Sequence, residues 1–216
     1  MNLTSTAFFD GEPIPEQYAA LKNDGPQATK PAENLSPPLS WTDVPIGTQS
    51  FALLCRDPDV PADRTQMNVA ETTIAEDAPR TEIYHWVVAD IPADQIDLDE
   101  GAYSQDESVP AGVPSQSLTI GRSGVSDIRK RAAGTPAEAK ARYDGPAPPW
   151  NDQRLHRYEF TLYALSVPTL SLPSPFHAAD VLAAIEGKVL ESATLTGVYT
   201  LNPDLAPKQV GSTTAT

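Results

Sequence analysis

The chain has 216 residues, and its 15 Lys and Arg against 29 Asp and Glu give a formal net charge of −14. A surface this acidic repels nucleic acid and anionic lipid over most of its area, so we expect no nucleic-acid partner and expect any bound anion to be held by a local site. We interpret the acidity as a means of keeping the protein soluble, and the alternative interpretation is adaptation to a salty cytoplasm. At this length we expect one domain over residues 1–203, followed by a flexible polar tail over residues 204–216.

The cellular compartment is predicted from the cysteine content and the N-terminus. Cys55 is the single cysteine of the sequence, so no internal disulfide is expected. The first residues lack the basic start and apolar stretch of a signal peptide, which predicts a cytoplasmic protein. No apolar run approaches the ~18 residues that a bilayer requires, so we expect no membrane span.

Five runs rich in aromatic and β-branched residues predict β-strands, because each is bounded by Pro, Gly or Asp. The 22 prolines are roughly twice the average usage and are scattered between these runs, which indicates stiff loops. In chain order, the runs are Leu3–Phe9, Ser50–Arg56, Ile83–Asp90, Arg157–Leu165 and Thr194–Leu201.

The alternation of side chains along these runs places three polar residues near the core. In the second run the apolar face continues onto Asp57, and in the fourth it extends back onto His156. The third run is apolar on both faces, which predicts a central strand with His85 on the same face as Val87.

Two helices are predicted. The 3.6-residue period indicates one over Ala178–Ser192, packed at the edge of the strands. A capping-box pattern indicates another that begins at Thr135-Pro-Ala-Glu138. The second lies in Arg122–Arg142, which holds six of the fifteen basic residues. That segment is either a docking surface for an acidic partner or a solvated helix.

The run that ends at Arg56 leads into Asp57-Pro-Asp-Val-Pro61. Its prolines remove backbone donors and fix φ, so we expect the strand to stop and turn there with Asp57 held rigidly. Alone, this motif also fits a plain turn with two solvated aspartates. It is more specific as the first of four signatures in one order, followed by His85-Trp-Val-Val88, Gly145-Pro-Ala-Pro-Pro149 and His156-Arg-Tyr158.

With these signatures the sequence resembles the phosphatidylethanolamine-binding protein family, also called Raf-kinase-inhibitor-like proteins, and most closely its bacterial-type members. The resemblance covers nearly the whole chain and includes Leu35-Ser-Pro-Pro-Leu-Ser-Trp41 and Phe160-Thr-Leu-Tyr-Ala-Leu165. It implies an all-β fold, a Greek-key-like sandwich of antiparallel sheets with a few peripheral helices. It also implies a small pocket for phosphate or a phosphorylated head group. The implied pocket residues are Asp57, His85, Pro148, His156 and Tyr158, with Asp59 and Arg157 in support.

The chemistry of these residues suits an anion. Two imidazoles and a tyrosine hydroxyl supply N–H and O–H donors, and an adjacent carboxylate raises the pKa of a histidine and keeps it protonated. The sequence therefore predicts that Asp57, His85 and His156 converge, and that phosphate binds there without turnover. Binding is predicted to weaken as pH rises. No catalytic residue, cofactor or metal is expected.

Alternatives remain open from the sequence. One Asp and two His also form the ligand set of a 2-His-1-carboxylate metal enzyme. A hydrolase would need an activated nucleophile, but no Gly-x-Ser-x-Gly is present and Cys55 lies in a core register. The resemblance also allows an interaction protein that inhibits a kinase or protease. The sequence leaves the oligomeric state open, with a homodimer as one possibility. Thr65–Glu82 and Arg122–Arg142 look like insertions that either cover the site or serve a partner.

Overall fold

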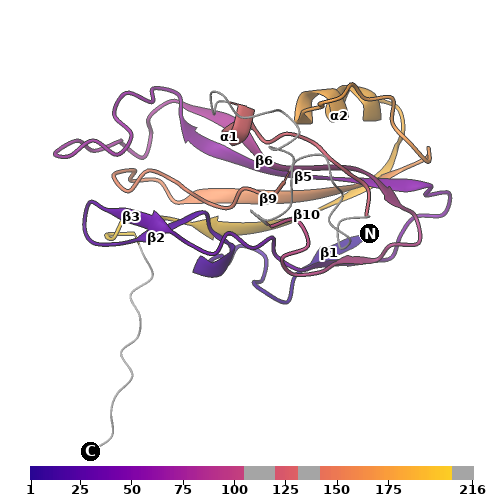
Figure 1. Cartoon of the computed structure of the whole chain (residues 1–216), viewed down its shortest axis with the longest axis horizontal. Helices are drawn as coiled ribbons and strands as arrows, with labels where there is room; N and C mark the ends of the chain where they lie inside the picture. The colour runs from indigo at the N-terminus through magenta and orange to yellow at the C-terminus, as the bar shows by residue number, and fades with distance from the viewer. Residues whose placement is uncertain (105–119, 131–141, 206–216) are drawn as a thin grey trace, which may run out of the picture.

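The computed structural model describes residues 1–104, 120–130 and 142–205, in which two antiparallel sheets enclose the main core. A helix covers the outer face of the larger sheet, on the side away from β1 (Figure 1). The larger sheet has the order β10 (Val189–Tyr199), β9 (His156–Leu165), β5 (Ser50–Pro61), β6 (Arg80–Pro92) and β8 (Arg122–Ser123). The smaller sheet has the order β1 (Asn2–Thr4), β4 (Leu39–Thr42) and β7 (Asp97–Leu98). The predicted all-β class is confirmed.

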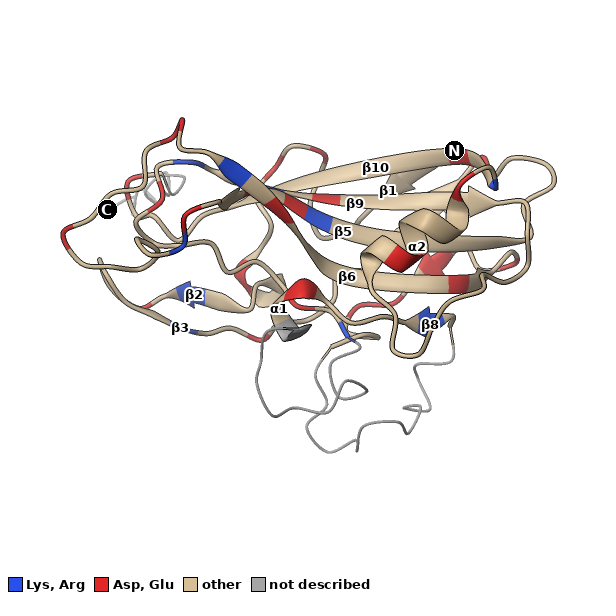
Figure 2. Cartoon of the chain, turned by 90° about the horizontal axis from the view of Figure 1, so that it is seen from above, with Lys and Arg blue, Asp and Glu red and all other residues tan. Residues whose placement is uncertain are grey.

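Short elements complete the fold. They are the strands β2 (Leu21–Asn23) and β3 (Thr29–Pro31), which form a separate hairpin, the 3₁₀ turn η1 (Glu16–Tyr18), and the helices α1 (Asp127–Lys130) and α2 (Ala178–Ile185). No helix among the described residues is long and apolar enough to cross a membrane. Acidic side chains are spread over strands, loops and α2, with few basic ones between them (Figure 2).

The central strands are buried because both of their faces are covered. The inner face packs against the smaller sheet through large side chains such as Phe51, Trp86 and Phe160. The outer face packs against α2 through smaller ones such as Ala52 and Val87. The predicted burial of the third run on both sides is thus correct, and apolar burial of this kind contributes most of the stabilisation of a domain.

The strand β5 does not stop at the Asp-Pro-Asp motif, contrary to the expectation from its prolines. It continues to Pro61, and its pairing with β6 shifts register between Asp57 and Val60. Because a bulge leaves residues without ladder hydrogen bonds, Pro58 fits there without the loss of a bond. The bulge fixes Asp57 within the sheet rather than in a turn.

A second register shift, between Cys55 and Arg56 on β5, corrects the prediction for His85. Tyr84 packs on the outer face of the sheet, while Trp86 packs on the inner face. The shift lies opposite these residues and turns His85 towards the inner face, where its ring meets that of Tyr158 at 5.1 Å. Strict alternation had placed His85 on the outer face with Val87.

The predicted helix over Ala178–Ser192 is too long. The helix α2 ends at Ile185, and Gly187 follows with φ of +69°, a conformation that few residues other than glycine adopt. Val189, which fits the helical period, instead begins β10 and pairs with Leu165. The helix also packs on the outer face of the large sheet rather than at its edge.

Two predicted strands have other bounds in the structure, and two further predictions lie wholly or mostly outside the described residues. The first strand ends at Thr4 instead of Phe9, and the Ser5 hydroxyl that follows it donates to the backbone oxygen of Pro38. The last strand covers Val189–Tyr199 and so begins before Thr194. The helix predicted from Thr135 and most of the predicted tail lie outside the described residues.

Candidate anion-binding site

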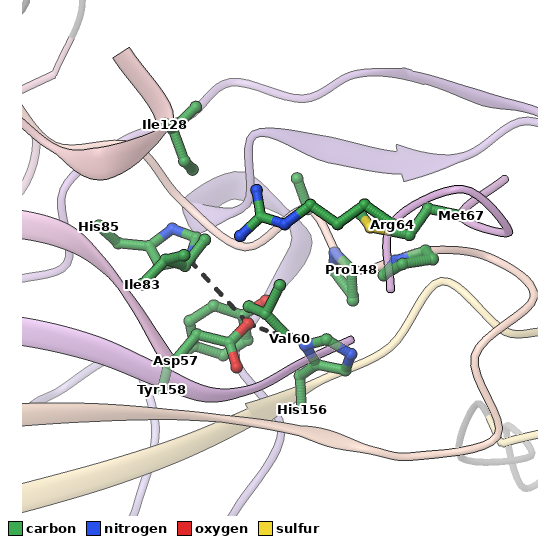
Figure 3. Close-up of a pocket in the computed structure, with 12 residues that line it drawn as sticks. Asp57, Val60, Arg64, Met67, Ile83, His85, Ile128, Pro148, His156 and Tyr158 are labelled. Carbon is green, nitrogen blue, oxygen red and sulfur yellow. Dashed lines mark hydrogen bonds and ion pairs between the residues drawn. The ribbon is translucent and has the colours of Figure 1, made fainter. Parts of the chain in front are cut away.

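A pocket of about 240 Å³ opens where β5, β6 and β9 meet the loop before β9 (Figure 3). Drug-sized ligands occupy pockets of about 300–1,000 Å³, so this one suits a smaller molecule. Its lining includes all five residues that the family resemblance implied. The full set is Asp57, Val60, Arg64, Met67, Ile83, His85, Ile128, Ala147, Pro148, Pro149, His156 and Tyr158.

The convergence of three polar side chains, predicted from the sequence, is present in the pocket. Asp57 Oδ2 lies 2.8 Å from His156 Nδ1 and 4.0 Å from His85 Nε2, although the two outer residues are 99 positions apart. All three side chains are almost completely buried. Asp57 Oδ1 is held in turn by the backbone N–H of Asp59 at 2.8 Å.

His156 lies between two carboxylates. Its Nε2 atom is 3.1 Å from Asp152 Oδ2, while its Nδ1 faces Asp57. Asp152 also accepts two bonds from the guanidinium of Arg80, at 2.5 and 3.0 Å. Asp57, His156, Asp152 and Arg80 thus form a buried row of alternating charges.

This row determines the protonation of His156. Burial alone would lower the pKa of His156, but its hydrogen bonds to Asp152 and Asp57 outweigh burial and raise the pKa to about 9. Burial raises the pKa of Asp152, yet the bonds from His156 and Arg80 bring it below its ordinary value. Both ring nitrogens of His156 therefore donate to carboxylates, and neither is left to donate to a ligand. This differs from the prediction from the sequence, in which His156 contacts the anion.

His85 has the opposite arrangement, with one nitrogen free. Its Nδ1 lies 2.8 Å from the backbone oxygen of Asp144, and a carbonyl only accepts, so Nδ1 carries a proton. Its Nε2 is buried and has no hydrogen-bond partner among the described residues. An unsatisfied buried group of this kind costs about 1–3 kcal/mol, which is recovered when a ligand supplies the partner.

Tyr158 supplies a second free group in the same pocket. Its hydroxyl is buried without a hydrogen bond of normal geometry in the described part of the chain, although the backbone of Ala147 interacts with it weakly. Burial raises the pKa of Tyr158 well above the usual value, so the hydroxyl stays protonated and can donate.

The segment Gly145-Pro-Ala-Pro-Pro149, which forms one wall of the pocket, is positioned by close packing. A Cβ on Gly145 would lie 2.2 Å from the backbone oxygen of Tyr18, so glycine is required there. The Gly145 N–H also donates to Asn34 Oδ1 at 2.7 Å. Pro148 is thereby held against the pocket, where the resemblance placed it.

Asp59 and Arg157, which the resemblance assigned to support, form an ion pair beside the pocket at 2.9 Å. Arg154 binds the same carboxylate at 3.2 Å. Burial raises the pKa of Asp59, but the bonds from Arg157 and Arg154 lower it below its ordinary value. This pair fixes the start of β9 against the end of β5.

Several lining and supporting residues were missed by sequence reasoning. Met67 comes from the first predicted insertion and Ile128 from the second, so both insertions contribute to the pocket wall, and Arg64 immediately precedes the first. Asp152 precedes His156 by four positions, a spacing that could have been noticed. Arg80 is placed by pairing of β6 with β5, and its local sequence carries no signal for this role.

The other chemistries considered from the sequence find little support in this geometry. Within the described ranges, no group of three or more His, Cys, Asp or Glu is arranged to hold a metal ion. To bind a metal, His156 would also have to give up its hydrogen bonds to Asp57 and Asp152. Burial, with Asp57 and Glu159 nearby, raises the pKa of the Cys55 thiol well above its ordinary value, so it remains protonated.

The fold and the pocket together define the class of protein: an all-β sandwich with a small, mostly apolar pocket into which a few polar groups converge. A sequence profile described as "Phosphatidylethanolamine-binding protein" matches residues 4–200, and the chain belongs to this family. A UPF0098 protein of Methanothermobacter thermautotrophicus is 37% identical over 92% of this chain and 98% of its own length. The UPF0098 protein YbhB of Escherichia coli is 29% identical over 92% of this chain and 99% of its own.

Solved structures show the same relationship. The fold is similar to that of Escherichia coli YbcL, which is described as a new member of the mammalian phosphatidylethanolamine-binding protein family. The TM-score is 0.65, with 26% identity over 92% of this chain and 97% of that one. It is also similar to a Chlamydia trachomatis homologue, with a TM-score of 0.61 and 29% identity over 92% and 95% of the two chains.

Proposed function

We propose that this protein binds a small anion, phosphate or a phosphorylated group, in the pocket at Asp57, His85 and Tyr158, and that it releases the anion unchanged. The observation that carries the proposal is the pair of buried polar atoms, His85 Nε2 and the Tyr158 hydroxyl, that have no partner of normal geometry among the described residues and share one pocket. Family membership supports the same conclusion.

The tautomer of His85 predicts how binding depends on protons. With Nδ1 committed to the Asp144 carbonyl, Nε2 of a neutral ring presents a lone pair, whereas Nε2 of a protonated ring donates. A fully ionised phosphate oxygen binds only the second form. Binding therefore requires one proton, either on the ring or on the phosphate, and should weaken as pH rises.

We expect calorimetric titration with inorganic phosphate to show net proton uptake at about pH 7, measured in two buffers of different ionisation enthalpy. His85→Gln should remove the uptake and weaken binding by roughly 1.5–3 kcal/mol, the value of a charge-assisted hydrogen bond. Asp57→Asn removes the carboxylate that lies 4.0 Å from His85 Nε2 and should change how binding depends on pH.

The control is His177→Gln, because His177 lies at the start of α2 and outside the pocket lining. This variant should bind phosphate like the wild type. Binding that ignored pH and both pocket substitutions would show that the anion sits elsewhere.

A further inference from the structure

Arg64 enters the pocket from the loop after β5. Its side chain crosses the pocket, with the stem beside Met67 and the guanidinium on the side of His85 (Figure 3). The backbone around it is held in place: the Ala62 N–H bonds Pro79 at 2.9 Å, and the Thr65 N–H bonds Asp63 Oδ1 at 2.9 Å. The loop is thus fixed while the guanidinium remains free to bind a ligand.

Arg64 differs from its neighbours in having no acidic partner. Within the described residues, no carboxylate forms an ion pair with Arg64, although the chain carries 29 Asp and Glu. Other arginines are paired with carboxylates, namely Arg56, Arg80, Arg122, Arg154 and Arg157. An arginine without a carboxylate in so acidic a protein leaves positive charge in the pocket.

The remaining charges of the pocket balance one another. Asp57, protonated His156, Asp152 and Arg80 alternate in sign, and this buried row has no net charge. The charge available to an anion therefore comes from Arg64 at every physiological pH, and from His85 when its ring is protonated.

We propose that Arg64 is the specificity-determining residue of the site and selects a phosphomonoester over a phosphodiester. This inference rests on the proposed function. A guanidinium binds two terminal oxygens of one phosphate through parallel N–H donors. A monoester keeps enough terminal oxygens for Arg64, His85 and Tyr158 together and carries up to two charges.

A diester is disfavoured for two reasons. It retains one charge and two terminal oxygens, so the three donors must share acceptors and the attraction to the Arg64 charge is weaker than for a dianion. Its second ester arm must also fit within about 240 Å³, between the side chains of Met67, Ile128 and Pro148.

The test compares methyl phosphate with dimethyl phosphate by calorimetry at about pH 7.5, where the monoester is mainly dianionic because its second pKa is about 6. Wild type should prefer methyl phosphate by at least about tenfold. Arg64→Met keeps the length of the stem and removes the charge. It should lose at least about tenfold in affinity for methyl phosphate, and its preference for methyl phosphate over dimethyl phosphate should fall severalfold, with only the steric part remaining.

The control is Lys30→Met, which makes the same change in net charge on an exposed strand outside the pocket and should keep the preference. Loss of binding in His85→Gln with an unchanged preference in Arg64→Met would overturn the role of Arg64 and leave the proposed function standing. Failure of wild type to bind either probe would overturn both.

Discussion

At the scale of single residues, His156 and His85 have different roles in the site, although they look equivalent in the sequence. His156 is enclosed by Asp57 and Asp152 and supplies charge and rigidity. His85 keeps one nitrogen free and can contact a ligand. The difference lies in their partners, because a carboxylate on each side saturates an imidazolium, while a single backbone carbonyl leaves the other nitrogen available.

The carboxylates around His156 also make stability depend on pH. Its pKa rises from the ordinary 6.5 to about 9 on folding. A group whose pKa is raised in the folded state contributes stability that is complete below its unfolded pKa and is lost as pH rises through its folded pKa. We therefore expect the free energy of unfolding, measured in urea, to fall from about pH 6.5 to 8.5 by an amount on the order of one to a few kcal/mol.

His156→Gln should be less stable than wild type at pH 6.5, because Asp57 and Asp152 lose a charged partner, and its stability should be nearly flat over the same range. His177→Gln, at the start of α2, should keep the wild-type slope. An equal slope in His156→Gln and wild type would assign the pH dependence to another group.

At the scale of elements, the regular strands were predictable and their irregularities were not. In β9 an unbroken alternation places His156 and Tyr158 on the inner face, as the sequence predicts. Asp57 follows from the same reasoning on β5. His85 reaches the site only through a register shift, which depends on pairing between β5 and β6 and leaves no local pattern.

The helix prediction failed for a related reason. Val189 continues the helical period, but its backbone hydrogen bonds are taken by β9, so tertiary pairing overrides local periodicity. The pocket wall was equally hidden. Met67 and Ile128 belong to segments interpreted as insertions, and spacing along the chain could not show that both line the same cavity.

The loop between β5 and β6 is attached to the rest of the site by Asn151. The Asn151 side chain donates to Gln66 at 2.8 Å and to Thr72 at 3.1 Å, and accepts from the Asn68 N–H at 2.9 Å. The backbone of Ile74 adds two further bonds to this region. These contacts hold the segment that carries Arg64 and Met67.

Asn151→Ala should release this segment, because the four hydrogen bonds of the side chain are lost and partly buried backbone groups are left without that partner. We expect hydrogen exchange over residues 65–79 to accelerate, with protection of β9 largely retained. Asn2→Ala, which breaks one exposed bond to Asp43, is the control and should leave the loop unchanged. Unchanged exchange in Asn151→Ala would show that the backbone bonds of Ile74 suffice.

At the scale of the whole molecule, the net charge of −14 opposes the approach of any anion, so the proposed binding requires attraction that acts at short range within the pocket. The charge of Arg64 acts inside a low-dielectric site, where Coulomb interactions are several times stronger than in water. The screened field outside falls off within about 10 Å at 0.1 M salt. An acidic exterior is therefore compatible with the anion binding that we propose for the interior.

The position of Cys55 gives the molecule an intrinsic kinetic reporter. Cys55 is the single thiol of the chain, is 1% exposed, and lies in β5 between Trp86 on one side and Phe160 on the other. A thiol reagent can reach it only when the central strands separate, so the labelling rate measures opening of the sheet that carries the pocket. A ligand that binds only the closed form should slow labelling by a factor of 1 + [L]/Kd.

The rate at which this thiol is labelled therefore measures the affinity of an anion that itself carries no label. The necessary control is Cys55→Ser, which should give no labelling at all. Labelling of wild type that proceeded at the rate of a free thiol would mean that β5 is accessible without opening of the sheet.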